Sequence, residues 1–246
     1  MITLYQFKFS HFCEKTRWNL DYKGLPFSVR NLLPGLHLKV TGKLAPKSSV
    51  PIIVDNGQVV QGSAQILNYL DEQYPEYSLT PDDPALAEEA QAWEQFVDEE
   101  IGPTLRLWFY YYALPDRKCA LNFLLDGAPW YGRPLFAVIY PKVRAKMIDF
   151  MGINAETAAA AKDRFETALD RLDEALAGKR FLVGDQFSRA DLAACALLSP
   201  YCAPGRSNRE IDSVFPGPVR ELREAHRERP FFKWVNAMYG EYRSPR

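Results

Sequence analysis

Residues 10–18 read Ser-His-Phe-Cys-Glu-Lys-Thr-Arg-Trp, and this segment decides how the chain begins to fold. The apolar residues 2–7 before it predict a strand, and the helical spacing that follows Cys13 predicts a helix. Ser10 and Cys13 therefore lie three residues apart where a strand turns into a helix. The first N–H groups of a helix lack intrahelical partners and lie at the positive end of its dipole, so this start favours an anion such as a thiolate.

The composition limits the classes of function. The 246 residues suffice for one large domain or two small ones, and 47% of them are hydrophobic. A formal net charge of -1 gives no global field that would attract nucleic acid or an anionic membrane. The four cysteines form no Cys-x-x-Cys pair, so we expect no zinc site and a reducing compartment. No signal peptide or membrane-spanning run is evident, which predicts a cytoplasmic protein without metal, nucleic-acid or membrane partners.

Strand signals occur only in the first 80 residues. Residues 51–54 and 58–60 flank Asn56-Gly57, a pair typical of a tight hairpin turn. Residues 33–49 carry several Pro and Gly, and we expect them to be irregular. Only helical patterns follow residue 85, so the sequence predicts an α/β unit followed by a helical one.

The helical part carries two kinds of signal. Gly102 and Pro103 interrupt a long apolar helix and predict a kink, and the prolines in 115–152 predict a series of short helices. Ser188 and Asp191 have the spacing of a capping box, in which the Asp191 carboxylate reaches back to the N-cap. We expect this pair to be structural.

Two further motifs each allow two interpretations. Val50-Pro51 can be a plain strand start, or a cis turn that presents the Val50 backbone to a peptide-like ligand. Ser63 follows Gly62 at a predicted helix start, where it can cap its own helix or help to hold a carboxylate.

The order of these motifs, together with Pro230 and Trp234 near the end, resembles the glutathione transferase superfamily from Met1 to Tyr239. The resemblance implies an α/β thioredoxin-like N-terminal domain followed by an all-α C-terminal helical domain. It places the glutathione-binding domain at residues 1–77, a linker at 78–84 and the substrate-binding domain at 85–246.

The resemblance also assigns residues to glutathione. Ser10 falls where serine-type classes carry their catalytic hydroxyl. The helix N–H groups near Phe12 lie beside the sulfur, and His37 lies in the loop that often touches the glycyl carboxylate. Val50 and Pro51 match the loop that pairs with the cysteinyl backbone, and Ser63 matches the serine that holds the γ-glutamyl carboxylate. Gly62 departs from the family pattern, which has an acidic residue or glutamine there, and Gln61 is a possible substitute.

Cys13 is the rival of Ser10 as the working residue. It occupies the second position of a dithiol motif whose first position is Ser10. A glutathione-dependent reduction needs cysteine at the first position, because that sulfur forms the mixed disulfide. The serine therefore favours thiolate stabilisation over disulfide chemistry, and a small buried residue is the simpler interpretation of Cys13.

The electrophile is expected on the aromatic run at residues 108–112. By resemblance, Trp108, Tyr111 and Tyr112 line the substrate pocket, and the long segment 113–152 reshapes that pocket or the dimer edge.

The function implied is a cytoplasmic, dimeric glutathione transferase of detoxification. It would use glutathione as co-substrate and activate the thiolate for attack on a hydrophobic electrophile. The alternatives are a catalytically weak binding protein of the same fold, indicated by Gly62, and a thiol oxidoreductase that depends on Cys13.

Overall fold

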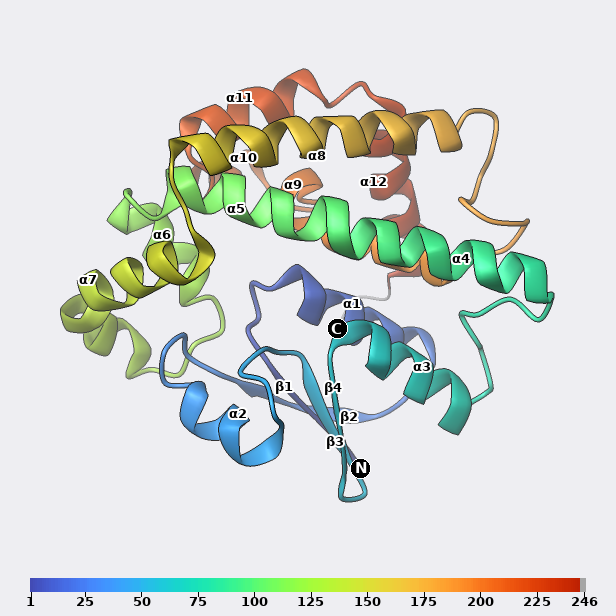
Figure 1. Ribbon diagram of the computed structural model, residues 1–246, viewed down its shortest axis with the longest axis horizontal. Helices are drawn as coiled ribbons and strands as arrows, with labels where there is room; N and C mark the ends of the chain where they lie inside the picture. Colours follow the sequence, from blue (N-terminus) through green and yellow to red (C-terminus); the bar gives the residue numbers. More distant parts are fainter. Residues whose placement is uncertain (244–246) are drawn as a thin grey trace.

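The computed structural model describes residues 1–243, except for the side chains of residues 208, 209 and 212. A four-stranded sheet with its helices forms the N-terminal part, and only helices follow from residue 84 (Figure 1). Helix α1 (His11–Tyr22) joins the two parts, because it contacts both α3 (Ser63–Gln73) and α9 (Arg189–Cys202). The chain therefore has the thioredoxin-like α/β domain and the all-helical domain that the sequence predicts.

The sheet has the strand order β2-β1-β3-β4. Its strands are β1 (Ile2–Gln6), β2 (Phe27–Asn31), β3 (Ile52–Asp55) and β4 (Gln58–Gln61). β1 and β2 are parallel and are connected through α1, whereas β3 and β4 form an antiparallel hairpin. The hairpin turn has positive φ at Asn56 (46°) and Gly57 (89°), a conformation that Asn-Gly adopts readily. The predicted hairpin is confirmed.

The connection between β2 and β3 contains a short helix, α2 (Leu38–Leu44), where the sequence predicted an irregular segment. Gly42 lies inside this helix and weakens the local helical signal. The Thr41 hydroxyl donates to the carbonyl of His37 at 3.1 Å and ties the helix to its first turn. The helix thereby fixes the loop from Pro34 to His37, which borders the functional site.

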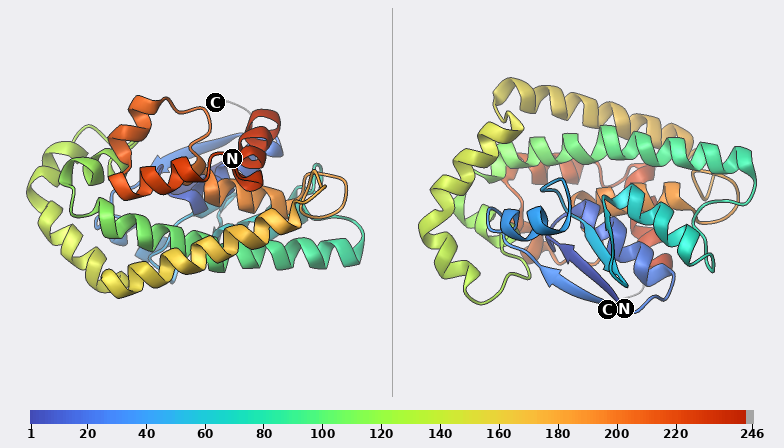
Figure 2. Two further views of the ribbon diagram at one scale, coloured as in Figure 1. Left: turned by 90° about the horizontal axis from the view of Figure 1, so that it is seen from above. Right: turned by 60° about the horizontal axis from the view of Figure 1, so that its bottom comes forward.

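The helical part is built around α9, of which nearly every residue is buried. The surrounding elements are α4 (Pro84–Phe96), the π-helical turn η1 (Val97–Ile101), α5 (Gly102–Ala113), α6 (Arg117–Leu124), α7 (Gly132–Met151), α8 (Ala155–Ala175), α10 (Asn208–Val214), α11 (Gly217–Ala225) and α12 (Pro230–Tyr242). Helices α5 and α8 pack along each other, as Figures 1 and 2 show. Their shared core includes Trp108, Phe165 and Leu169.

The predicted interruption at Gly102-Pro103 is present as the turn η1 immediately before them. Gly102 has a packing role there. A Cβ atom at this position would lie 2.7 Å from Cζ of Phe12 and 2.8 Å from Cδ2 of Leu197, closer than atoms normally pack. Glycine therefore lets α5 approach the start of α1.

Helix α7 differs from the short, proline-broken helices expected over residues 115–152. It runs for 20 residues with Pro141 inside it. Pro141 has no N–H to donate to the carbonyl of Ala137 four residues earlier. The Arg117 guanidinium donates to that carbonyl instead, at 2.6 Å. A side chain from another helix thus satisfies the group that the proline frees.

A buried ionic cluster joins the two parts of the chain. The Lys15 ammonium, 1% exposed, lies 2.6 Å from Oε1 of Glu94 and 2.7 Å from Oδ2 of Asp98. The other Glu94 oxygen accepts from Nε of Arg189 at 2.6 Å, and Nη2 of Arg189 donates to Asn68 at 2.7 Å. Buried charges are costly unless they are paired, so this cluster requires α1, α3, α4 and α9 to keep their mutual positions.

Candidate functional site

Ser10 is the N-cap of α1. Its backbone is extended (φ -78°, ψ 124°), and its hydroxyl accepts from the N–H of Cys13 at 3.4 Å. That distance is long for a hydrogen bond, so the cap is weak. Ser10 lines a large cavity. Its hydroxyl also hydrogen-bonds the Cys13 thiol and lowers the pKa of that thiol. Because a hydroxyl has a single rotatable proton, a ligand in the cavity would compete with Cys13 for it.

Cys13 faces the interior and is fully buried. Burial raises the pKa of its thiol, and the smaller opposing influences of Arg17 and Ser10 do not reverse this shift. A thiol with a raised pKa stays protonated near neutral pH and is a poor nucleophile. Cys13 does not line the cavity that Ser10 lines, so the two residues have different surroundings despite their closeness in the sequence.

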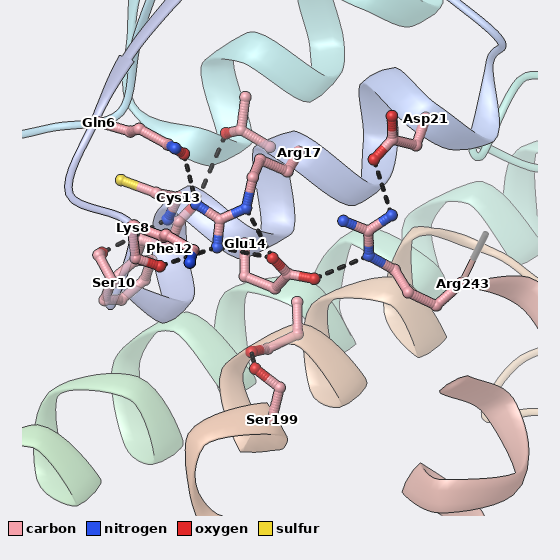
Figure 3. Close-up of polar contacts among 12 residues, drawn as sticks. Gln6, Lys8, Ser10, Phe12, Cys13, Glu14, Arg17, Asp21, Ser199 and Arg243 are labelled. Carbon is pink, nitrogen blue, oxygen red and sulfur yellow. Dashed lines mark hydrogen bonds and ion pairs between the residues drawn. The ribbon is translucent and has the colours of Figure 1, made fainter. Parts of the chain in front are cut away.

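A charged network fixes the first turns of α1, as Figure 3 shows. The Arg17 guanidinium donates to the Gln6 side chain, to the carbonyl of Lys8 at 3.1 Å and to Glu14 at 2.7 Å. Glu14 also accepts from Arg243 at 2.8 Å. Burial alone would raise the pKa of Glu14, but Arg17 and Arg243 hold it below its ordinary value. The helix start is thus tied to β1 and to the end of α12.

The Val50-Pro51 peptide bond is cis, and Val50 lines the same cavity. Neither the N–H nor the C=O of Val50 takes part in a hydrogen bond among the described residues. The loop before it is fastened by the Gln61 side chain, whose Nε2 donates to the carbonyls of Lys47 and Ser49, each at 2.7 Å. Gln61 is therefore engaged in holding this loop.

Ser63 is the first residue of α3, and the cap position belongs to Gly62. Of the two interpretations of Ser63, the one that makes it the cap of its own helix is wrong, because its side chain makes no capping bond. The Ser63 hydroxyl has no hydrogen-bond partner in the described part of the chain, although the residue is buried. Gly62 has a φ of 99°, and a Cβ there would collide with the Gln65 amide. The positive φ, which side-chain-bearing residues rarely adopt, explains the glycine at position 62.

The other residues expected at the glutathione site differ in their roles. His37 and Phe12 line the cavity. Nδ1 of His37 accepts from the N–H of Gly35 at 3.0 Å, and burial lowers the pKa of this imidazole, which favours the neutral form. Pro51, Gly62 and Ser63 do not line the large cavity. The structure thus brings Ser10, Phe12, His37 and Val50 together at one opening.

The cavity has a volume of about 1230 Å³ and lies between the N-terminal part and helices α5, α6 and α7. Leu105, Arg106, Phe109 and Tyr110 of α5 line it. Trp108, Tyr111 and Tyr112 do not, which corrects the sequence expectation. Trp108 is 2% exposed and stacks near Phe165 in the core. Residues three and four apart share a helix face, so the packing of Trp108 against α8 turns residues 105, 106, 109 and 110 toward the cavity.

Sequence reasoning missed Arg106, and it expected the segment 113–152 to reshape the pocket or the dimer edge without naming the residues that line the cavity. Arg106 is the only charged residue between Ile101 and Pro115, and this isolation in an apolar helix was the available signal. Phe123 on α6 packs edge-on against Phe109, with ring centroids 5.1 Å apart. Lys142 and Lys146 on α7 also line the cavity. Their place follows from α7 being one long helix.

No group of three or more potential metal ligands lies together within residues 1–243. Over the same residues, no helix combines the length and apolar character needed to cross a membrane.

The two parts of the chain match two family models. Residues 4–78 match "Glutathione S-transferase, N-terminal domain", and residues 135–207 match "Glutathione S-transferase, C-terminal domain". A probable glutathione S-transferase of Nicotiana tabacum is 24% identical over 197 residues, which cover 78% of this chain and 68% of that protein.

Solved structures show the same fold. A glutathione S-transferase of Ceriporiopsis subvermispora, in complex with glutathione, has a TM-score of 0.68 at 18% identity and covers 100% of this chain and 98% of its own. The β-etherase LigF of Sphingobium sp. strain SYK-6 has a TM-score of 0.65 at 23% identity, covering 95% of this chain and 98% of its own.

Proposed function

Because the chain belongs to the glutathione S-transferase superfamily, we propose that it binds glutathione and activates its thiolate for attack on a hydrophobic electrophile. One observation carries this proposal. Ser10, the N-cap of α1, lines a cavity of about 1230 Å³, where its hydroxyl can rotate its proton from the Cys13 thiol to a ligand. The glutathione bound to the Ceriporiopsis subvermispora relative supports the same ligand here.

The proposed glutathione-binding site uses polar groups that have no hydrogen-bond partner among the described residues. The Val50 N–H and C=O are unpaired among the described residues and would bond the cysteinyl backbone as an added strand does. The Ser63 hydroxyl and the first N–H groups of α3 would hold the γ-glutamyl carboxylate. His37 stays at the glycyl end as a neutral group. Gln61 does not replace the missing acidic group, because its amide is bonded to residues 47 and 49.

Ser10 acts in this mechanism as a thiolate stabiliser. Its hydroxyl donates to the sulfur, and the N–H groups near Phe12 add positive potential. Each unit by which the thiol pKa falls corresponds to about 1.4 kcal/mol. One charge-assisted hydrogen bond of about 1.5–3 kcal/mol and a helix terminus of about 0.3–1 kcal/mol together lower that pKa by about one to three units. The sulfur then attacks the electrophile, and the thiol proton passes to solvent.

The buried, protonated thiol of Cys13 argues against the oxidoreductase alternative. The catalytically weak binding protein remains the second candidate, and Gly62 is the observation that favours it, since its conformation excludes the usual acidic side chain. We also propose a cytoplasmic homodimer with a role in detoxification. Its domains would be residues 1–77 and 85–246, joined by a linker at 78–84.

The test combines glutathione binding with turnover of chlorodinitrobenzene. We expect Ser10→Ala to lower kcat/KM about 10- to 100-fold, while the Kd for glutathione changes less than about twofold. The pH at which the ultraviolet absorbance of the bound thiolate reaches half its maximum should be higher in this variant. Cys13→Ala is the matched control in the same helix and should keep full turnover.

Three results would count against the proposal. Binding without turnover would support the binding protein. Loss of activity in Cys13→Ala alone would support the oxidoreductase. A wild-type protein that neither binds glutathione nor turns over the aryl halide would reject the transferase.

A further inference from the structure

Arg106, in the wall of the cavity, is a cation without a counter-ion among the residues that the structure describes. It lies on α5, is partly buried, and makes none of the hydrogen bonds or ion pairs found among the described residues. Its Nε is buried and has no partner. Arg17, Arg189 and Arg229, by contrast, each bond to at least one carboxylate. Because a buried charge is costly unless it is paired, an unpaired guanidinium in a cavity points to a ligand that pairs with it.

The neighbours of Arg106 do not balance its charge. Burial and the nearby Arg106 charge lower the pKa of His11 to about 3, and burial raises the pKa of Tyr110 to about 12. Both groups are therefore neutral near pH 7. His11 follows Ser10 directly and Tyr110 lies one helical turn after Arg106. The charge of Arg106 acts on both groups, so the guanidinium lies near each of them.

The remaining charges of the cavity add to the imbalance. Six Lys and Arg side chains line it against three carboxylates. Asp126 pairs with Lys8 at 3.0 Å, and the Glu210 carboxylate accepts from the N–H of Ser207 at 2.8 Å. The third carboxylate, Asp149, lies on the exposed side of α7. The whole chain has a net charge of only -1, so this excess of positive charge is local to the cavity.

We propose that the electrophile is an aromatic carboxylic acid whose carboxylate binds Arg106. Its ring would pack on Phe109 and Phe123, which contact each other and line the same cavity as Arg106. A guanidinium can bond both oxygens of one carboxylate, which fixes the plane and direction of the ring. The ring carbon would then face the sulfur beside Ser10. This inference rests on the proposed transferase function and narrows its substrate class.

The test uses para-chloro-meta-nitrobenzoate and its methyl ester. In each case the sulfur of glutathione bonds to the ring carbon, chloride leaves with the bonding electrons, and the thiol proton goes to solvent. Each kcat/KM is divided by the uncatalysed rate constant, because the two rings differ in reactivity. Arg106→Met should lower this ratio of kcat/KM to the uncatalysed rate constant about 10- to 100-fold for the acid. The same ratio for the ester should fall less than about twofold.

Two further variants sharpen the test. Arg106→Lys keeps the charge but cannot make the bidentate hydrogen bond to a carboxylate. Its rate ratio with the acid substrate should therefore lie between those of the wild type and Arg106→Met. Lys179→Met removes an exposed charge outside the cavity and should change neither ratio. Arg106→Met should also unfold at no lower temperature than the wild type, because Arg106 bonds to no group in the described part of the chain.

An equal loss for acid and ester would overturn the proposal, since Arg106 would then act on glutathione. A separate binding assay covers the case in which the protein catalyses neither reaction. We expect para-nitrobenzoate to quench tryptophan fluorescence with a Kd about 10- to 100-fold lower in the wild type than in Arg106→Met. The methyl ester should bind both proteins equally. Equal binding of para-nitrobenzoate to both proteins would reject the site even if the transferase function fails.

Discussion

Helices α1 and α9 both have a serine as their N-cap, and they use it differently. Ser10 starts α1 and Ser188 starts α9. The residue three positions later is Cys13 in the first helix and Asp191 in the second. The Asp191 carboxylate accepts from the N–H and hydroxyl of Ser188, each at 2.9 Å. A thiol at position 13 offers no carboxylate acceptor, and the Ser10 N–H donates instead to the carbonyl of Phe7 at 3.1 Å. The N–H groups of His11 and Phe12 have no hydrogen-bond partner among the described residues.

This difference separates a structural helix start from a candidate ligand site. The α9 start is buried and its polar groups are satisfied within the chain. The α1 start opens on the cavity and its cap bond is long, at 3.4 Å. A serine at an N-cap is therefore no functional signal by itself. The residue three positions on, and the exposure of the turn, decide which role it has.

The largest effect should come from removing the carboxylate that closes the α9 start. Asp191→Ala takes away the acceptor of three hydrogen bonds, including one from the N–H of Leu182 at 2.8 Å. We expect the free energy of unfolding to fall by about 3–5 kcal/mol, measured by urea denaturation. Asp191→Asn, which keeps the volume and one acceptor, should lose less. A loss below about 1 kcal/mol would mean that the α9 start is not closed by this residue.

The buried imidazole of His11, at the start of α1, should make the free energy of unfolding depend on pH. His11 has a folded pKa of about 3 against an ordinary value of 6.5. Below pH 6.5 the unfolded chain therefore binds a proton that the folded chain does not, and stability falls as pH falls. From pH 6.5 to pH 5 this amounts to about 2 kcal/mol. Urea denaturation of the wild type and His11→Leu across this range measures the difference. Equal slopes for the two proteins would contradict a buried, neutral His11.

Exchanging each serine for alanine compares the two starts directly. Ser188→Ala should lower the free energy of unfolding by about 1–2 kcal/mol, whereas Ser10→Ala, with its long cap bond, should lower it by less than about 1 kcal/mol. Turnover should show the opposite order, with Ser188→Ala close to the wild type. Thermal unfolding and aryl halide kinetics on the same samples measure both quantities. Equal losses of stability would make Ser10 an ordinary cap.

Cys13 should give the smallest effect. Cys13→Ala removes one buried sulfur and should cost about 1 kcal/mol of stability. The raised thiol pKa also predicts that iodoacetamide alkylates Cys13 slowly in the folded protein near neutral pH. Mass spectrometry of the native and urea-unfolded protein measures the two rates. Rapid alkylation in the folded state would contradict the assignment of Cys13 to the core.

Local sequence signals predicted much of the fold. The hairpin at Asn56-Gly57, the Ser188–Asp191 capping box and the interruption before Gly102 are all present, because each depends on residues within a few positions of one another. The long helix α7 was missed for the opposite reason. Arg117, 24 residues before Pro141 in the chain, supplies the bond that the proline cannot make.

The candidate site divides in the same way. Ser10, Phe12, His37 and Val50 come from separate segments, and the order of motifs was enough to assign them to one place. The aromatic run on α5 was assigned to the cavity by its composition. Its orientation could not be deduced, because it depends on the packing of Trp108 against Phe165 on α8, more than 50 residues later.

The sequence by itself determined the family, the two-part architecture and the serine at the start of α1, because these follow from residue types at short fixed spacings. Only the tertiary structure decided that Gln61 is engaged in a loop, and that Arg106 lines the cavity without a counter-ion among the described residues. Burial and charge pairing depend on which distant segments pack together. The helical period gives the faces of a helix, and its neighbours decide which face meets the ligand.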